Sequence, residues 1–311
     1  MRRWLWLALA LSGCGHAAPE YKSFSDVPYG YERSRDLWCA KAQLFMHVEE
    51  LGPQLSAKPP IILLHPWGLN MTVWAQVAPE LAKDRRVILI DLPGHGKSSK
   101  LHTHYPMARL AQAVLDVMDA LAVPRAVVAG NSLGGATSIA VAERAPQRVQ
   151  ALVLIAAPGG AALPQPVLKA AHSLANRGAL RTLSDEAWFF GVAFVARSLS
   201  PAADRLSSDL MGLRHSPEWP AWSDATITIL RSVATYAPDL ERLGMPALVV
   251  HGTGDLLITE RLNTALAARL PQGRLRVLEG CGHMPEVECP EALVRVLRSF
   301  LQGQGGPPGP S

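Results

Sequence analysis

The chain has 311 residues, of which 49% are hydrophobic, and its formal net charge at pH 7 is +4. This length and hydrophobic content allow one large domain with a sizeable buried core. The basic residues are scattered along the sequence instead of forming blocks, so they are typical of a solvated surface, and we expect no nucleic-acid partner.

The N-terminal residues are typical of an export signal. Arg2 and Arg3 precede an apolar run at residues 4–11, which is too short to span a bilayer as a helix. The run ends in Leu-Ser-Gly-Cys at residues 11–14, and this motif resembles the bacterial lipobox. The resemblance implies that residues 1–13 are a lipoprotein signal peptide and that Cys14 is acylated. An ordinary signal peptide with an incidental cysteine is the alternative.

An acylated Cys14 implies a location in the bacterial cell envelope. The lipid would hold the protein at a membrane surface, and the glycine at position 15 favours the outer membrane, facing the periplasm. Residues 14–36 are rich in polar residues, Gly and Pro. We therefore interpret them as a tether between the lipid and the folded domain.

Strand-like and helix-like segments alternate from residue 37 onward. Short apolar runs predict buried strands, and apolar residues at helical spacing predict helices. We expect strands at residues 44–50, 60–65, 86–91, 125–129, 149–155, 247–251 and 275–278, and helices at 72–83, 107–121, 260–270 and 290–301. The alternation predicts an α/β fold with a mostly parallel sheet flanked by helices, because parallel strands need such crossovers.

One long segment, residues 159–238, contains helical patterns but no convincing strand. It is much longer than an ordinary connection between core elements. We expect it to form a helical cap over the carboxyl ends of the strands, where open α/β sheets bind ligands; the alternative is that it completes the core. The core then comprises residues 37–158 and 239–302, and the Gly/Pro-rich tail, 303–311, is expected to be disordered.

The strand expected at residues 125–129 runs directly into Gly130-Asn131-Ser132-Leu133-Gly134, and a helix-forming stretch follows. A Gly-x-Ser-x-Gly motif between a strand and a helix is the pattern of a nucleophile elbow. Such a turn strains the serine backbone and lifts its hydroxyl above the sheet. Ser132 is therefore the predicted nucleophile.

Two later residues have the types and positions that an activated serine needs. An alcohol requires a base within hydrogen-bond reach, and the base requires an orienting acid. Asp255 follows the strand at 247–251, and His283 follows the strand at 275–278. Each residue alone has an ordinary structural explanation, as a turn former or a packed histidine. The order serine, acid, histidine on one sheet edge predicts a catalytic triad of Ser132, Asp255 and His283.

A tetrahedral intermediate also needs two hydrogen-bond donors for its oxyanion. We assign the backbone N–H of Leu133, which follows the nucleophile. By position, the second donor is the backbone N–H of Trp67, in the His-Pro-Trp-Gly loop at residues 65–68.

These motifs, with Asp-Leu-Pro-Gly-His-Gly-Lys-Ser at 91–98 and Gly-His at 282–283, resemble the α/β-hydrolase fold superfamily over about residues 40–302. The resemblance implies an eight-stranded, mostly parallel sheet with the cap inserted after the sixth strand. The elbow and Ala-Pro-Gly-Gly at 157–160 are similar to the branch of carbon–carbon bond hydrolases, and esterases and lipases share that elbow. The chain departs from the family at Pro66, where glycine is usual, and at Met284, because that branch commonly has a Trp shortly after the catalytic histidine.

Other sites are disfavoured by their spacing. Residues 91–98 lack the first glycine of a phosphate-binding loop, because position 91 is Asp. Gly252 and Gly254 lack the third glycine of a dinucleotide fingerprint. No Cys/His spacing suggests a metal site, so we expect neither cofactor nor metal.

Of the four cysteines, Cys281 and Cys289 flank the segment that holds His283. In the oxidising compartment that export implies, a bridge between them would brace this segment. Free buried thiols are equally compatible with the sequence, which does not determine connectivity.

The sequence thus predicts a serine hydrolase that cleaves carboxylic esters of small hydrophobic substrates through an acyl-enzyme intermediate. Two alternatives stay open. One is hydrolysis of carbon–carbon bonds of the meta-cleavage type with the same triad. The other is a non-catalytic, anchored binding protein that keeps the fold.

Overall fold

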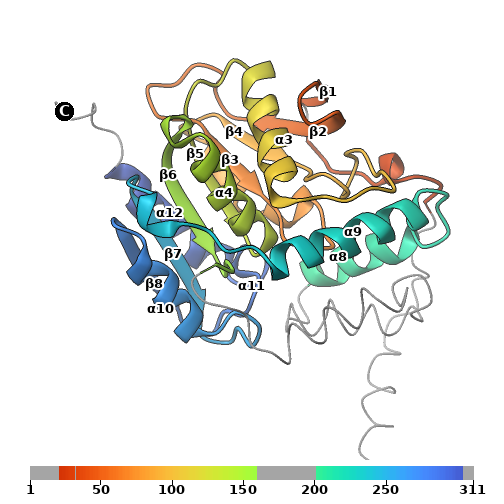
Figure 1. Ribbon diagram of the computed structural model, residues 1–311. Helices are drawn as coiled ribbons and strands as arrows, with labels where there is room; N and C mark the ends of the chain where they lie inside the picture. Colours follow the sequence, from red (N-terminus) through yellow and green to blue (C-terminus); the bar gives the residue numbers. More distant parts are fainter. Residues whose placement is uncertain (1–20, 32, 160–200, 304–311) are drawn as a thin grey trace, which may run out of the picture.

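The computed structural model describes residues 21–31, 33–159 and 201–303 (Figure 1). The signal peptide, Cys14, the first part of the expected cap and the tail after Gly303 lie outside the described residues. In the part of the chain that the structure describes, no helix has the length and apolar character needed to cross a bilayer.

Eight strands form a sheet in the order β1-β2-β4-β3-β5-β6-β7-β8. Strands β1 and β2 are antiparallel to their neighbours, and all other pairs are parallel. The predicted α/β fold with a mostly parallel sheet is confirmed. The strands are β1 Ser34–Cys39, β2 Leu44–Leu51, β3 Ile61–Leu64, β4 Val87–Ile90, β5 Ala126–Asn131, β6 Val149–Ile155, β7 Ala247–Gly252 and β8 Gly273–Leu278.

Helices cover both faces of this sheet. In the described residues, the α-helices are α2 Ala78–Ala82, α3 Met107–Ala120, α4 Leu133–Arg144, α8 Pro201–Gly212, α9 Trp219–Ala234, α10 Glu260–Arg269, α11 Pro285–Glu288 and α12 Pro290–Gln302. Short 3-10 helices are η1 Phe24–Asp26, η2 Met71–Trp74, η3 Pro146–Arg148 and η4 Leu240–Arg242. Helices α3, α4 and α10 contribute to the core on one face, and α2, α11 and α12 to the core on the other.

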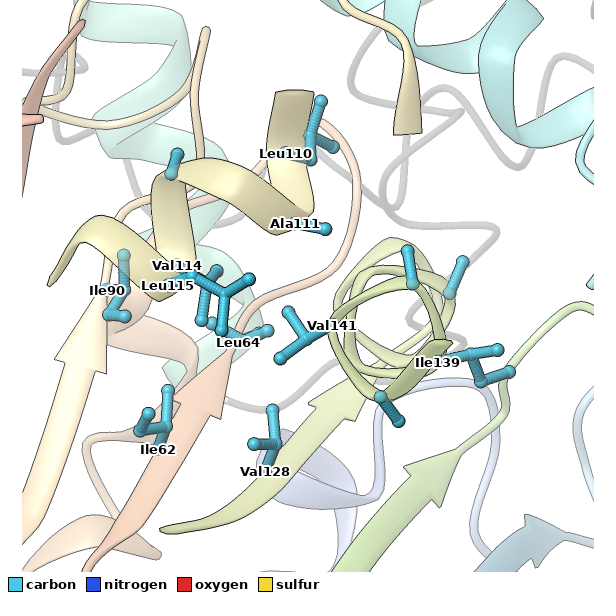
Figure 2. Close-up of a cluster of buried hydrophobic side chains, with 14 of the residues drawn as sticks. Ile62, Leu64, Ile90, Leu110, Ala111, Val114, Leu115, Val128, Ile139 and Val141 are labelled. Carbon is cyan, nitrogen blue, oxygen red and sulfur yellow. The ribbon is translucent and has the colours of Figure 1, made fainter. Parts of the chain in front are cut away.

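Alternating side chains of each central strand build the two cores. In β3, Ile62 and Leu64 pack toward α3 and α4, as Figure 2 shows, whereas Ile61 and Leu63 belong to the opposite core. All four are completely buried. Burying one such side chain contributes about 1.5–3 kcal/mol. Strands packed on both faces therefore hold their carboxyl ends, and the loops that follow, in fixed positions.

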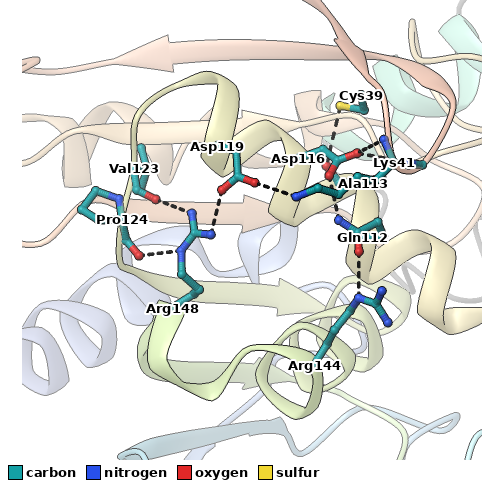
Figure 3. Close-up of polar contacts among 11 residues, drawn as sticks. Cys39, Lys41, Gln112, Ala113, Asp116, Asp119, Val123, Pro124, Arg144 and Arg148 are labelled. Carbon is teal, nitrogen blue, oxygen red and sulfur yellow. Dashed lines mark hydrogen bonds and ion pairs between the residues drawn. The ribbon is translucent and has the colours of Figure 1, made fainter.

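The hairpin of β1 and β2 is held against α3 by Asp116 (Figure 3). The Asp116 carboxylate accepts hydrogen bonds from the backbone N–H groups of Lys41 and Ala42, both at 3.0 Å, in the hairpin turn. The side-chain amide of Gln112 donates a further bond of 2.7 Å to the same carboxylate. The two bonds from the hairpin turn fix the edge of the sheet to α3.

The N-terminal region differs from the tether that we expected at residues 14–36. Ser34–Cys39 forms the edge strand β1, and Phe24 is buried among apolar side chains. The Tyr29 hydroxyl donates a 2.8 Å hydrogen bond to the buried carboxylate of Asp91. From Tyr21 onward, the described part of this region packs against the domain.

The helix expected at residues 72–83 is divided into η2 and α2. Pro79 is the physical reason, because it has no N–H to continue a helical ladder and is favoured in a first helical turn. Asn70 begins η2, where its side-chain oxygen accepts a 2.9 Å bond from the Thr72 N–H.

The described part of the expected cap is helical, and α9 contacts the loops that follow β3 and β4. The Trp67 indole N–H donates a 2.8 Å bond to the Thr226 carbonyl. A Cβ added to Gly94 would lie 2.7 Å from the Ala225 Cβ. Helix α9 therefore lies over the loops at the carboxyl ends of these two strands.

Candidate active site

Ser132 occupies a strained turn between β5 and α4. Its φ is 49° and its ψ is −110°, in a region that residues other than glycine rarely adopt. The Ser132 N–H donates a 2.9 Å bond to the Ile155 carbonyl at the end of β6. A Cβ on Gly130 would collide with the Gly134 backbone. The packing therefore requires glycine at Gly130, and the geometry is that of a nucleophile elbow.

Asp255 and His283 come together in the loops after β7 and β8. The Asp255 Oδ2 lies 2.9 Å from the His283 Nδ1, and both side chains are almost fully buried. The second carboxylate oxygen of Asp255 accepts bonds from the N–H groups of Leu257 at 2.8 Å and Ile258 at 3.0 Å. An ionised carboxylate only accepts hydrogen bonds, so the Nδ1 of His283 carries a proton in this pair, and in the neutral ring the Nε2 then has the lone pair.

Asn131 joins the elbow to the histidine loop. Its side-chain amide donates a 2.8 Å bond to the backbone carbonyl of His283. Ser132 is the next residue after Asn131. The residue beside the predicted nucleophile is thus hydrogen-bonded to the residue that would serve as its base.

The two predicted oxyanion donors lie in segments that touch. Leu133 is the first residue of α4, whose leading N–H groups have no partner within the helix. A Cβ on Gly134 would collide with the carbonyls of Leu64 and His65. The start of α4 and the loop that carries Trp67 are therefore in close backbone contact.

His65 fixes the orientation of the peptide group between Pro66 and Trp67. The Leu92 N–H donates a 2.9 Å bond to the His65 Nε2, so the proton of the neutral ring is on Nδ1. That Nδ1–H donates a 2.7 Å bond to the Pro66 carbonyl. In a trans peptide, the carbonyl and the next N–H point in opposite directions. His65 therefore directs the Trp67 N–H away from its own ring.

His95, in the loop after β4, lies beside His65. Their ring centroids are 5.2 Å apart in an edge-on arrangement. Burial lowers the pKa of His65, and burial together with the neighbouring His65 lowers the pKa of His95 well below its ordinary value. Both rings are thus neutral near pH 7, and His95 is completely buried.

The segment after His283 is held by a disulfide between Cys281 and Cys289, which the sequence left open. It also contains two acidic residues that sequence reasoning did not assign. Glu286 is completely buried, and Glu288 accepts hydrogen bonds from the backbone around His283. In residues 21–31, 33–159 and 201–303, no group of three His, Cys, Asp or Glu side chains is arranged to hold a metal ion.

A family model described as the alpha/beta hydrolase fold matches residues 59–288, a span that includes the elbow, Asp255 and His283. The chain belongs to the alpha/beta hydrolase fold family. The expected alpha/beta hydrolase fold, with its eight-stranded and mostly parallel sheet, is confirmed.

Several curated proteins resemble this alpha/beta hydrolase. The dihydrolipoyllysine-residue acetyltransferase component of an acetoin cleaving system from Pseudomonas putida is 36% identical over 78% of this chain, which spans 63% of that relative's length. A pimeloyl-[acyl-carrier protein] methyl ester esterase from Edwardsiella ictaluri is 30% identical, with 84% of this chain and 98% of the relative covered. A 2-hydroxy-6-oxo-2,4-heptadienoate hydrolase from Pseudomonas putida is 29% identical, with 80% and 91% covered.

The family and the two relatives that are named as an esterase and a hydrolase identify this alpha/beta hydrolase as a hydrolytic enzyme. The finding disfavours the alternative of a non-catalytic binding protein. Sequence reasoning missed Asn131 and Glu288. The signal for Asn131 was its place beside the nucleophile, and the signal for Glu288 was its closeness to His283 in the chain.

Proposed function

We propose that this alpha/beta hydrolase is a serine esterase that cleaves carboxylic esters of small hydrophobic substrates through an acyl-enzyme intermediate. The observation that carries the proposal is the buried pair of His283 and Asp255, whose loop is bonded to Asn131 beside Ser132. A protonated Nδ1 leaves the Nε2 of His283 as the base that a serine hydroxyl requires.

In the proposed reaction, the Ser132 Oγ attacks the ester carbonyl while His283 takes its proton. Asp255 holds the imidazole in the required tautomer and stabilises its charged form. The imidazolium then donates its proton to the leaving alcohol, and the acyl group remains on Ser132. Water that is deprotonated by His283 attacks the acyl-enzyme and releases the acid, which restores the free serine.

The backbone N–H groups of Leu133 and Trp67 are the proposed oxyanion donors. Donors of this kind act best when their orientation is fixed before the reaction. The position of Leu133 at the start of α4 and the His65 bond to the Pro66 carbonyl supply such preorganisation. Pro66, the departure from the family pattern, is part of this arrangement because its carbonyl accepts the His65 bond.

Hydrolysis of a carbon–carbon bond in a vinylogous diketone is the second candidate. The same triad would serve that reaction, and a relative from Pseudomonas putida is named as a hydrolase of 2-hydroxy-6-oxo-2,4-heptadienoate. The esterase proposal is supported by a relative of similar identity that is named as a methyl ester esterase. We favour the esterase because the Trp that commonly follows the catalytic histidine in the carbon–carbon branch is replaced by Met284 and Pro285.

Parallel rate assays separate the two reactions. The purified protein is given p-nitrophenyl esters of increasing acyl length and, separately, a ring-fission dienoate. We expect turnover of the esters and none of the dienoate. Ser132→Ala is the inactive variant, and Ser299→Ala, which removes an exposed hydroxyl on α12, is the matched control. Turnover of the dienoate without turnover of any ester would replace the esterase proposal with the second candidate.

We also propose that the enzyme is anchored in the bacterial cell envelope by lipid on Cys14, at the outer membrane facing the periplasm. The support is the lipobox-like sequence at residues 11–14, which follows a short apolar run. The test is partition of the full-length protein, expressed in a bacterium, between detergent and aqueous phases. We expect the wild type in the detergent phase and Cys14→Ser in the aqueous phase. Equal partition of both proteins would contradict the anchor.

A further inference from the structure

The Glu288 carboxylate binds the backbone on both sides of His283. The Gly282 N–H donates a 2.7 Å hydrogen bond to the Glu288 Oε2, and the Met284 N–H donates a 2.9 Å bond to the Oε1. These amides belong to the residues immediately before and after His283. One side chain therefore restrains the backbone at both neighbours of the proposed base.

Further bonds hold the backbone of residues 281–289. The Glu288 N–H donates a 2.9 Å bond to the Met284 carbonyl, so Glu288 and Met284 are bonded to each other in both directions. A Cβ on Gly282 would lie 2.5 Å from the Glu288 Oε2, so a side chain at that position would displace the carboxylate. The next residue, Cys289, forms a disulfide with Cys281. The arrangement is specific to a side chain with two acceptor oxygens and the length of glutamate.

Glu288 is a partly buried carboxylate beside the proposed triad of Ser132, Asp255 and His283. Burial raises the pKa of Glu288 above its ordinary value, and the N–H groups of Met284 and Gly282 and the nearby His283 offset only part of that rise. The Asp255 carboxylate faces the same region and opposes a second negative charge there. Because its bonds to the backbone amides are charge-assisted, they are stronger than bonds to a neutral side chain.

We propose that Glu288 is a positioning residue for the hydrolytic reaction, in which it holds the His283 imidazole at the place and angle that proton transfer from Ser132 requires. The proposal rests on the proposed function of Ser132 and His283. Glu288 does not touch the reacting atoms, so it acts through the backbone of His283 and through its negative charge.

Two substitutions separate the effect of the length of the Glu288 side chain from the effect of its charge. Glu288→Asp keeps the charge but is one methylene shorter, so it cannot bond both amides at once. We expect its kcat to fall about tenfold with KM unchanged. A tenfold fall corresponds to about 1.4 kcal/mol, which is the size of one such hydrogen bond. The acidic limb of its pH–rate profile stays where it is in the wild type.

Glu288→Gln keeps the length but loses the charge and one of the two acceptors. We expect a fall in kcat of about tenfold to a hundredfold, because a small misplacement of a catalytic group has effects of this size. In addition, the acidic limb moves to lower pH, since an anion that favours the protonated imidazole is removed. Glu291→Gln removes an exposed carboxylate from the first turn of α12 and is the matched control, with wild-type kinetics.

A fluorophosphonate probe supplies a second readout that does not depend on knowing the substrate. The labelling rate of Ser132 reports on its activation by His283, and we expect it to fall in both Glu288 variants while their thermal midpoints show that they are folded. Wild-type kcat and labelling rates in folded Glu288→Gln would overturn the positioning role alone. Absence of labelling in the wild type would instead overturn the proposed function, and the positioning role with it.

Discussion

The side-chain amide of Asn131 donates a hydrogen bond of 2.8 Å to the backbone carbonyl of His283, a residue 152 positions later in the chain. Asn131 is the last residue of β5, and His283 lies in the loop after β8. The bond therefore ties the strand that carries the predicted nucleophile to the loop that carries its predicted base. Together with the bonds of the Glu288 carboxylate to the Gly282 and Met284 N–H groups, this bond holds three successive residues of the His283 segment.

Replacing Asn131 by Asp tests this bond with almost no change of shape. A carboxylate cannot donate to the His283 carbonyl, and two acceptors would then face each other in a buried site. We expect kcat to fall by about tenfold or more, with KM little changed, because loss of one buried bond is worth about 1–3 kcal/mol. Steady-state kinetics at saturating ester measure the effect. Unchanged kcat in the folded Asn131→Asp variant would contradict the role of this bond.

Glu286 predicts a pH dependence of stability. Burial raises its pKa to about 8, and neither carboxylate oxygen has a hydrogen-bond partner among the described residues. The folded protein therefore holds this proton more tightly than the unfolded chain, whose ordinary value is 4.5. The stabilising contribution is complete below about pH 4.5 and is lost as the pH rises through about 8.

Glu286→Gln removes this titration while keeping the size of the side chain. We expect the thermal midpoint of the wild type to fall relative to that of the variant as the pH rises from 5 to 9. Differential scanning calorimetry of both proteins over this range measures the difference. Parallel curves across the whole range would show that Glu286 does not titrate in this way.

The Cys281–Cys289 disulfide predicts a dependence of stability on oxidation. Its two cysteines are separated by 8 positions, and closing a loop of this size contributes about 2.5 kcal/mol in the chain-entropy description. We expect the Cys281→Ser/Cys289→Ser variant to lose about 2–3 kcal/mol of unfolding free energy and some kcat, because the loop of His283 is freed.

A reducing agent provides the control for this prediction. It should lower the denaturant midpoint of the wild type and leave the double variant unchanged, since only the wild type has a bond to reduce. A wild type that is reduced, as shown by thiol titration, yet keeps its midpoint would contradict the stabilising role of the disulfide.

Most of the sheet was predictable because its central strands are continuous apolar runs. Residues 149–155 and 247–251 are buried on both faces, so their sequences have a signal that does not depend on partners. The edge strand β1 was missed. Its sequence, Ser-Arg-Asp-Leu-Trp-Cys, is largely exposed, and it is a strand because it pairs with β2 and is held through the hairpin turn by Asp116.

The candidate site also has a part that could be predicted from the sequence and a part that could not. Ser132, Asp255 and His283 could be placed at one edge of the sheet from motif and strand order alone, and the structure brings Asp255 and His283 into contact. The bonds made by Asn131 and Glu288 could not be predicted. They depend on how the loop after β8 folds back. Glu286 and Glu288 have similar sequence contexts, but only the Glu288 carboxylate has hydrogen-bond partners among the described residues.

Activation of the Ser132 hydroxyl by His283 can be measured with a fluorophosphonate probe, followed by intact-mass analysis and peptide mapping of the labelled protein. We predict one adduct on Ser132 in the wild type, none in folded Ser132→Ala, and a labelling rate at least about a hundredfold lower in His283→Ala. An unlabelled wild type, or a His283→Ala variant that is labelled at the wild-type rate, would contradict activation of Ser132 by His283.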